Sequence, residues 1–352
     1  MAASGAAIGV ENLDVAYGRT KVLHDVSLTI PAGRFVALIG SSGCGKTTLL
    51  RAISGFVTPQ RGRILVDERD VTAEPPERRG MAMVFQSYAL WPHMSAAQNV
   101  GYGLKLRGMG RAERARKVDE ILELLRLQGF GERKVTDLSG GQRQRVALGR
   151  ALAIDPPILL LDEPLSNLDA KIRLAMRHEL KSLHRRLGLT AVHVTHDQEE
   201  AMVMADEIVV LDQGRIVQQG APEDVYRRPN SSFVASFLGA DNIIEGEVRR
   251  DSDGAKLTLA DGGALDLPTA PEGHGRHVIQ FRSDAVRLDD DAAGPALRLD
   301  GRIAQASYPG GRWRYEIDTP AGRFLVDDSR RASAGDAVRL AIPAEELHIF
   351  PR

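Results

Sequence analysis

The amino-acid sequence predicts an α/β fold with a mainly parallel central sheet, followed by a smaller all-β domain of barrel type. Up to about residue 239, short apolar runs alternate with helical patterns, which is typical of a parallel sheet. The clearest of these runs are Phe35 to Ile39, Ile158 to Leu161 and Ala191 to Thr195. After Asp241 the pattern changes to short alternating runs separated by glycine turns such as Gly310-Gly311. Two domains are therefore expected, residues 1–239 and 240–352.

Length, charge and cysteine content narrow the classes of function. The chain of 352 residues is long enough for two domains with separate cores. A net charge of −1 gives no reason to expect a nucleic-acid partner, because such a partner requires a basic surface. Cys44, the single cysteine, cannot form an intrachain disulfide, so a reducing compartment fits the sequence best.

Hydropathy gives an expectation about location. The sequence contains no apolar stretch of about 18 residues, and Met1 to Gly9 lacks the basic and long apolar regions of a signal peptide. We therefore expect a soluble, cytoplasmic protein. Any work on a membrane would then require a partner that spans it.

The elements before and after the first buried strand follow from local patterns. Ile8 to Ile30 is expected to form antiparallel β structure, with Tyr17-Gly18 at a turn. Ser95 to Gln98 is a capping box that opens a helix-rich insert, expected at about residues 88–152. Within the insert, Arg111 to Arg126 combines a charged face with apolar residues at helical spacing, and a solvated helix is preferred to a nucleic-acid arm.

The run from Gly40 to Thr47 matches the glycine-rich phosphate loop between a strand and a helix. Such a loop directs backbone N–H groups at phosphates, and it allows Lys46 to reach the β- and γ-phosphate oxygens and Thr47 to hold Mg²⁺. The alternative, an ordinary glycine-rich turn before a helix, is disfavoured by the adjoining apolar strand. Binding of a nucleoside triphosphate is therefore predicted.

Two further motifs extend this site. Asp162 and Glu163 end an apolar strand, where Asp162 can hold Mg²⁺ and Glu163 can polarise an attacking water. Leu138 to Gln142 precedes a helical run and offers free N–H groups for a second anion. Taken alone, these motifs could also be an acidic turn and an ordinary serine-capped helix start.

Together the motifs resemble those of the ABC transporter ATPases over about the first 240 residues. The resemblance rests on the Walker A loop at Gly40 to Thr47, Gln86, Leu138 to Gln142, Asp162-Glu163-Pro164, Ser166 to Asp169, and His196. The C-terminal region resembles the TOBE domains of ATPase subunits of binding-protein-dependent bacterial importers. It departs from them at Phe281-Arg282-Ser283-Asp284, where such domains commonly carry Arg-Pro-Glu.

The resemblance implies a P-loop NTPase fold with a RecA-like core, an antiparallel β subdomain and a helical subdomain, followed by an OB-like domain. It implies that two copies meet head to tail, with ATP between them. The residues implied to bind ATP are Tyr17, Gly40, Ser41, Ser42, Gly43, Cys44, Gly45, Lys46, Thr47 and Thr48. The catalytic residues implied are Glu163, His196, Gln86 and Lys46, and those for Mg²⁺ are Thr47, Gln86 and Asp162. The second copy would contribute Ser139, Gly140, Gly141 and Gln142, and Asp169 would reach across the dimer.

Several of these residues have simpler interpretations. Tyr17, implied to stack on adenine, could be a surface aromatic at a turn, and His196, implied to contact the γ-phosphate, could be a capping or core residue. Asp169 is also a good helix N-cap. The segment Ser87 to Met94 is expected to dock a short helix of a membrane subunit, although its Trp91 and Met94 could be local core.

The function implied is the energy-coupling ATPase of a bacterial importer, peripheral on the cytoplasmic face of the inner membrane. Its partners would be a second copy of itself, two transmembrane permease subunits and, indirectly, a periplasmic or lipid-anchored solute-binding protein. Trp91 to Met94 and Leu238 to Asn242 resemble ferric-iron, phosphonate or polyamine importers more than sugar importers. The alternatives are a soluble ABC-type ATP switch in translation or DNA repair, disfavoured because the chain has one cassette and no heptad run, and an exporter.

Overall fold

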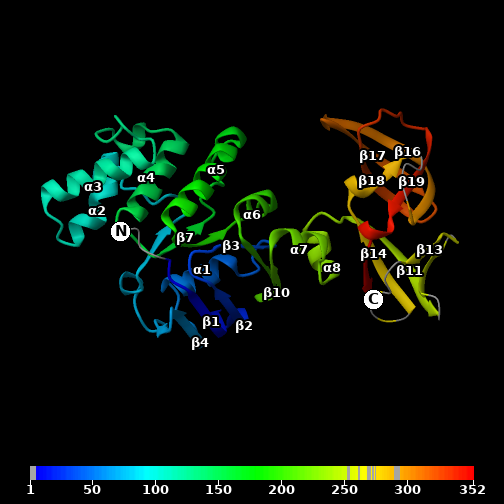
Figure 1. The fold of residues 1–352 in the computed structure, drawn as a ribbon, viewed down its shortest axis with the longest axis horizontal. Helices are drawn as coiled ribbons and strands as arrows, with labels where there is room; N and C mark the ends of the chain where they lie inside the picture. Colours follow the sequence, from blue (N-terminus) through cyan, green and yellow to red (C-terminus); the bar gives the residue numbers. More distant parts are fainter. Residues whose placement is uncertain are drawn as a thin grey trace. The chain divides into compact units, whose positions relative to one another are not determined.

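The computed structural model describes residues 5–251, 254–260, 262–267, 271, 273, 275–288 and 294–352. The chain divides into two compact units, Met1–Val225 and Tyr226–Arg352 (Figure 1).

A six-stranded sheet forms the centre of the first unit. Its strand order is β10-β9-β3-β8-β7-β6, and only the edge strand β10 runs antiparallel to its neighbour. The strands are β3 (Phe35–Gly40), β6 (Met81–Val84), β7 (Ile158–Asp162), β8 (Thr190–Val194), β9 (Glu207–Asp212) and β10 (Arg215–Gly220). Strands β3, β7 and β8 are buried along their whole length, because helices cover a parallel sheet on both faces.

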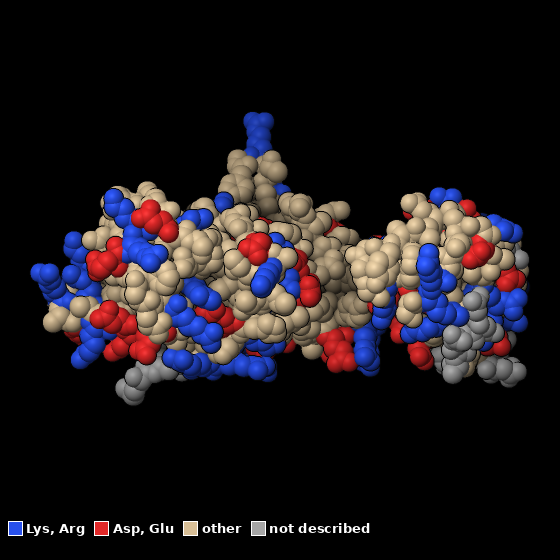
Figure 2. Space-filling model, turned by 90° about the horizontal axis from the view of Figure 1, so that it is seen from above, with Lys and Arg blue, Asp and Glu red and all other residues tan. Residues whose placement is uncertain are grey.

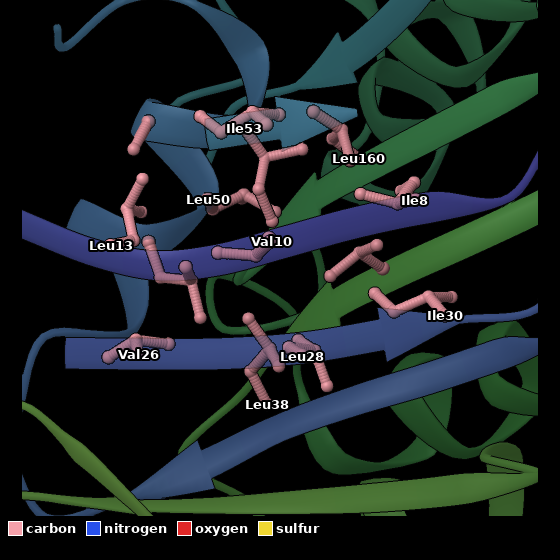
Figure 3. Packing of buried hydrophobic residues seen from close by; sticks show 14 of the residues in the cluster. Ile8, Val10, Leu13, Val26, Leu28, Ile30, Leu38, Leu50, Ile53 and Leu160 are labelled. Carbon is pink, nitrogen blue, oxygen red and sulfur yellow. The ribbon is translucent and has the colours of Figure 1, made fainter. Parts of the chain in front are cut away.

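A second, antiparallel sheet has the order β2-β1-β4-β5, which confirms the β structure predicted for Ile8 to Ile30. Its strands are β1 (Ile8–Tyr17), β2 (Thr20–Ile30), β4 (Arg61–Val66) and β5 (Arg69–Asp70). Apolar side chains of this sheet, of the central sheet and of helix α1 (Lys46–Ser54) form one buried cluster. Figure 3 shows part of it, with Ile8 and Val10 of β1, Leu28 and Ile30 of β2, Leu38 of β3, and Leu50 and Ile53 of α1. This packing fixes the strand and the helix that flank the phosphate loop.

The helical insert contains α2 (Ala96–Leu106), α3 (Arg111–Leu124) and α4 (Gly140–Leu152), and α2 packs against both of the others. Ser95 begins α2 with the predicted capping box, since its hydroxyl accepts from the backbone N–H of Gln98 and Gln98 accepts from that of Ser95. Two further helices, α5 (Ala170–Leu187) and α6 (Gln198–Met204), follow strands β7 and β8.

The second unit is built from two antiparallel five-stranded sheets around one apolar core. The first sheet contains β13 (Ala264–Leu267), β12 (Gly254–Leu259), β11 (Asn242–Asp251), β14 (Gly275–Phe281) and β20 (His348–Pro351). The second contains β15 (Arg287–Leu288), β19 (Ala337–Pro343), β16 (Ala296–Gly310), β17 (Arg312–Thr319) and β18 (Gly322–Asp328).

The two sheets exchange strands in a repeated pattern. Strand β14 is followed by a 3-10 turn, Ser283–Ala285, and by β15, which pairs with β19 of the second sheet. Strand β19 is likewise followed by a 3-10 turn, Ala344–Glu346, and by β20, which pairs with β14 of the first sheet. The strand–turn–strand unit thus occurs twice, and each copy completes the sheet of the other.

The second unit begins earlier than the domain boundary expected at residues 239–240, because helix α8 (Ser232–Phe237) packs on β14 and β20. Arg282 contributes to this attachment. Its guanidinium donates to the carbonyl oxygens of Tyr226, at 2.7 Å, and Leu238, at 3.3 Å, at the C-terminal ends of α7 (Pro222–Arg227) and α8. A cation is favourable there because helix C-termini present unpaired carbonyls. The division at 239 into functional domains stays a prediction.

Charged residues of both signs are interspersed on the face that Figure 2 shows. Within the described ranges, no helix combines the length and the apolar character that a bilayer span needs.

Candidate nucleotide-binding site

The phosphate loop connects β3 to α1 through backbone conformations that require glycine. Gly40 has φ 150° and Gly45 has φ 108°. A Cβ atom on Gly40 would lie 2.1 Å from the carbonyl oxygen of Leu211, and one on Gly45 would lie 2.6 Å from the side chain of Leu23. The tight packing of the loop against β9 and β2 therefore excludes larger residues at these positions.

Lys46 is buried at the start of α1, and the loop itself holds its ammonium group. The Nζ atom donates to the carbonyl oxygens of Gly40, at 2.8 Å, and Ser41, at 2.9 Å. A cavity of about 520 Å³ opens above the loop, and it is lined by Val22, Ser42, Gly43, Gly45, Lys46, Thr47, Thr48, Glu163 and His196. A cation and a helix N-terminus at one cavity form an anion-binding site.

Asp162 ends β7 beneath this cavity. The Thr47 hydroxyl donates to Asp162 Oδ1 over 3.1 Å. Burial raises the pKa of Asp162, and the hydrogen bond from Thr47 opposes that rise in part. A hydroxyl and a carboxylate oxygen are hard ligands, and Mg²⁺ is commonly held by one or two such groups together with substrate phosphates. The two side chains therefore fit the ion.

Glu163 adopts a left-handed backbone conformation, φ 45°, which is uncommon outside glycine and tends to occur at functional sites. Its N–H donates to the carbonyl of Val194 at the end of β8, over 3.0 Å. Its carboxylate accepts a 3.0 Å hydrogen bond from Gln86 Nε2, and Oε2 lies 3.4 Å from His196 Nδ1. These three polar side chains, which follow β6, β7 and β8, thus meet at the carboxyl edge of the sheet, where ligands bind in α/β folds.

Ser166 and Asn167, between β7 and α5, hold these three side chains in place, although the sequence predicts no individual role for either residue. The hydroxyl of Ser166 donates to the Glu163 carbonyl at 2.9 Å, and Asn167 Nδ2 donates to the Gln86 carbonyl at 2.9 Å. The only sequence feature that points to them is their place in the motif from Ser166 to Asp169. Val22 also lines the cavity, but nothing in the sequence pattern points to it, because a distant hairpin brings it there.

The remaining predicted residues lie elsewhere in the unit. Among described residues, the lining of the cavity does not include Tyr17, which is 48% exposed, nor the segment from Ser139 to Gln142. Ser139 caps α4 in a capping box with Gln142, and Asp169 caps α5 by accepting from the N–H of Ile172 at 3.0 Å. The proposed roles of these residues in a second copy's site stay predictions.

An ionic network around the buried Arg177 lies beside His196, and the sequence patterns did not predict it. Arg177 on α5, with a side chain only 6% exposed, contacts Asp197 at 2.6 Å and Glu199 at 3.0 Å. Burial opposes the charge on Arg177, but the bond to Glu199 and the neighbouring carboxylates outweigh it and raise the pKa of the guanidinium. Asp197 and Glu200 have the pattern of residues at a helix start, where Asp197 caps α6. That pattern does not predict their contacts with Arg177.

The segment predicted to dock a partner, Ser87 to Met94, combines packing with exposure. Trp91 packs on Tyr102 with ring centroids 4.1 Å apart, and Arg150 of α4 stacks on Trp91 at 4.9 Å, so Trp91 serves local packing. His93 and Met94 instead line a groove of about 840 Å³ together with residues of α2 and α3. Local packing is therefore confirmed for Trp91, and docking of a membrane subunit at this segment stays a prediction.

Comparisons with known proteins agree with this geometry. The family model described as ABC transporter matches residues 23–166, and the model of the TOBE domain matches residues 281–350. The chain is 43% identical over 350 residues to an sn-glycerol-3-phosphate import ATP-binding protein of Rhizobium johnstonii, covering 98% of this chain and 94% of that protein. It is 44% identical over 323 residues to an Fe(3+) ions import ATP-binding protein of Haemophilus influenzae, covering 90% and 95%. A solved dimeric ATP-binding cassette in a post-hydrolysis state, bound to ADP and Pi, is 33% identical and superposes with a TM-score of 0.55, covering 61% of this chain and 98% of that one.

Proposed function

The chain belongs to the ABC transporter family of ATP-binding proteins, and from this premise we propose that it hydrolyses ATP to power a bacterial importer. The observation that carries the proposal is the cavity where the phosphate loop, Glu163 and His196 meet. The lysine and the loop N–H groups suit a triphosphate, and the carboxylate suits a general base.

Each side chain has a chemical role in hydrolysis. Lys46 would move from the loop carbonyls to the β- and γ-phosphate oxygens, and Glu163 would accept the proton of the attacking water. Gln86 and His196 orient that carboxylate, and His196 would also donate to the γ-phosphate. Mg²⁺, when bound to Thr47 and Asp162 and to Gln86 directly or through water, would neutralise charge on the phosphates.

A second copy of the chain would complete the site. Ser139, Gly141 and Gln142 lie at the N-terminus of α4 with small or polar side chains, and they do not line the cavity of their own chain. In a head-to-tail dimer they would face the nucleotide held by the other copy. The two cassettes would then close around ATP and separate after hydrolysis.

The groove beside His93 and Met94 is the proposed docking site for a membrane-spanning permease subunit. The loop before it carries left-handed residues, Tyr88 and Ala89, whose carbonyls accept from Arg150 on α4. The loop also follows Gln86. Movement of Gln86 or of α4 would therefore reach the groove directly. A permease subunit bound there would hold the chain at the cytoplasmic face of the membrane, which is the proposed location.

The imported solute is proposed from the resemblance to named import proteins. The chain resembles import proteins named for Fe(3+) ions and for sn-glycerol-3-phosphate at nearly equal identity. Ferric iron, phosphonate and polyamine are the proposed solutes, with sn-glycerol-3-phosphate and a sugar as alternatives. Solute-dependent ATP turnover of the reconstituted transporter, measured with each candidate and its binding protein, decides among them.

The Glu163→Gln variant tests the catalytic proposal. Glutamine keeps the size and one acceptor oxygen but cannot take a proton, so turnover should fall at least a hundredfold while ATP affinity stays within about twofold. The variant should also elute as an ATP-dependent dimer in size-exclusion chromatography.

The control is Glu68→Gln, which changes an exposed acid that does not line the cavity. Near-normal turnover in Glu163→Gln would remove Glu163 as the base. Copurification of the wild-type chain with ribosomes or DNA, rather than with integral membrane proteins, would favour a soluble ATP switch instead.

A further inference from the structure

Two loops of the proposed site end at helix N-caps that lie close together. The first runs from Ser166 to Asp169, the N-cap of α5, and the second carries His196 and ends at Asp197, the N-cap of α6. Helices α5 and α6 pack on each other. Two arginines on α5, one turn apart, contact Asp197, and one of them also contacts the first loop.

Arg173 contacts both loops with one guanidinium group. Its Nη2 donates to the carbonyl oxygen of Leu168 at 3.0 Å, and its Nη1 lies 3.7 Å from Asp197 Oδ2. The side chain is 30% exposed, so its contacts are partly shielded from water. The planar fork of arginine allows two acceptors in different loops to be held at once.

Arg177 anchors the same carboxylate from the buried side. It reaches Asp197 Oδ2 at 2.6 Å and lies 3.9 Å from Glu200, whose side chain is 4% exposed. Buried ions in such a network are costly to separate. Asp197 is therefore held in one position by two arginines.

The backbone on both sides of His196 is fixed by this network. Thr195 Oγ1 donates to Glu200 Oε2 at 2.7 Å and accepts from the Asp197 N–H at 3.0 Å. The His196 side chain itself is 59% exposed and points into the shared cavity beside Glu163. The network thus leaves the imidazole accessible while it sets the path of the chain that carries it.

We propose that Arg173 is a positioning residue. With Arg177 and Asp197, it clamps the loop from Ser166 to Asp169 to the loop that carries His196. The clamp rests on the proposed function, in which His196 contacts the γ-phosphate and Asp169 reaches the second cassette. It makes the two loops move together, so that a nucleotide contact at His196 is transmitted to the dimer contact at Asp169. Arg173 acts on turnover through the loops and does not touch the nucleotide.

The test compares Arg173→Ala and Arg173→Lys with Arg185→Ala, a control at an exposed position on the same helix. Turnover, the affinity for a fluorescent ATP analogue and thermal stability are measured for each in the full chain with Mg²⁺. Arg173→Ala should lower kcat about tenfold and leave ATP affinity within twofold. Arg173→Lys should not restore kcat, because one ammonium cannot reach both acceptors. Restoration by lysine, or an unchanged kcat in the alanine variant, would overturn the clamp.

A kinetic cycle with Asp197→Asn separates the clamp from a general loss of stability. Asparagine keeps the acceptor that caps α6 but removes the charge that faces the arginines. The double variant Arg173→Ala/Asp197→Asn should have the kcat of the slower single variant, whereas independent effects would multiply and contradict the proposal. His196→Ala distinguishes failure of the premise: normal turnover in that variant removes His196 from the reaction, while a slow His196→Ala with a normal Arg173→Ala removes only the clamp.

Discussion

At the scale of single residues, the site depends on conformations that few side chains tolerate. Glu163 has φ 45°. In this conformation its N–H donates to the Val194 carbonyl, and its carboxylate lies beside Gln86 and His196. Gly40 adopts φ 150° with the backbone of β9 directly against it. The left-handed conformation of Glu163 costs free energy that the surrounding packing must offset, whereas glycine adopts φ 150° without strain.

Two glycine substitutions in the phosphate loop should therefore differ. Gly40→Ala should destabilise the chain by about 2–4 kcal/mol, because its Cβ would meet Leu211 at 2.1 Å. Gly43→Ala is the matched control: its φ is 78° but no atom lies within 4 Å of the added Cβ, so only about 1 kcal/mol is expected. Urea unfolding of both variants measures the difference. Equal losses would show that crowding against β9 is not the constraint.

At the scale of elements, helix ends carry much of the organisation. Ser95, Ser139, Asp169 and Asp197 each cap a helix with a side-chain oxygen, and the last three also lie in segments proposed to act on the nucleotide. At helix C-termini, the Arg282 guanidinium donates hydrogen bonds to backbone carbonyls of α7 and α8. These contacts attach α8 to the β unit.

Arg282→Ala should loosen α8. Hydrogen bonds from a charged group are worth about 1.5–3 kcal/mol, so amide hydrogen exchange in α8 should accelerate at least tenfold. The exposed neighbour Arg287, which bonds the Asp284 carbonyl away from α8, is the control as Arg287→Ala. Unchanged exchange in Arg282→Ala would mean that apolar packing alone holds the helix.

At the scale of the whole molecule, the β unit should respond to pH through His348. Burial first, and then the charge of Arg282, lower the pKa of His348 from 6.5 to about 4. Between these values the unfolded chain binds a proton that the folded chain does not, so stability is complete above pH 6.5 and is lost as pH falls toward 4. After allowance for partial solvent exposure, the loss is about 1–2 kcal/mol.

Thermal unfolding of the wild type and His348→Gln from pH 7.5 to 4.5 measures this contribution. Other acids titrate in the same range, so the difference between the two proteins is the relevant quantity. The variant should lose less stability than the wild type as pH falls. Parallel curves would show that His348 is protonated equally in both states.

The proposed dimer predicts complementation between two defective chains. Ser139→Ala, expected to lower turnover about a hundredfold, and Glu163→Gln would each be defective alone. A hybrid of the two contains one intact site only if Ser139 acts on the other chain's nucleotide. An equal mixture should then recover about a quarter of wild-type turnover, because half of random dimers are hybrids with one intact site of two. No recovery would place Ser139 in the site of its own chain.

The sequence by itself determined the fold class, the phosphate loop and the family, because each depends on local spacing: apolar strands before helices, glycines at fixed intervals, and acids that end a buried strand. The capping box at Ser95 was predictable for the same reason. Tertiary structure alone decided which residues surround these motifs. Val22 lines the cavity, and Arg173 and Arg177 hold the loop that carries His196. Arg282 attaches α8 to the β unit. Each of these contacts joins segments that are far apart in the chain. Such contacts leave no periodic pattern, since they depend on where the packing of the sheets and helices brings individual side chains together.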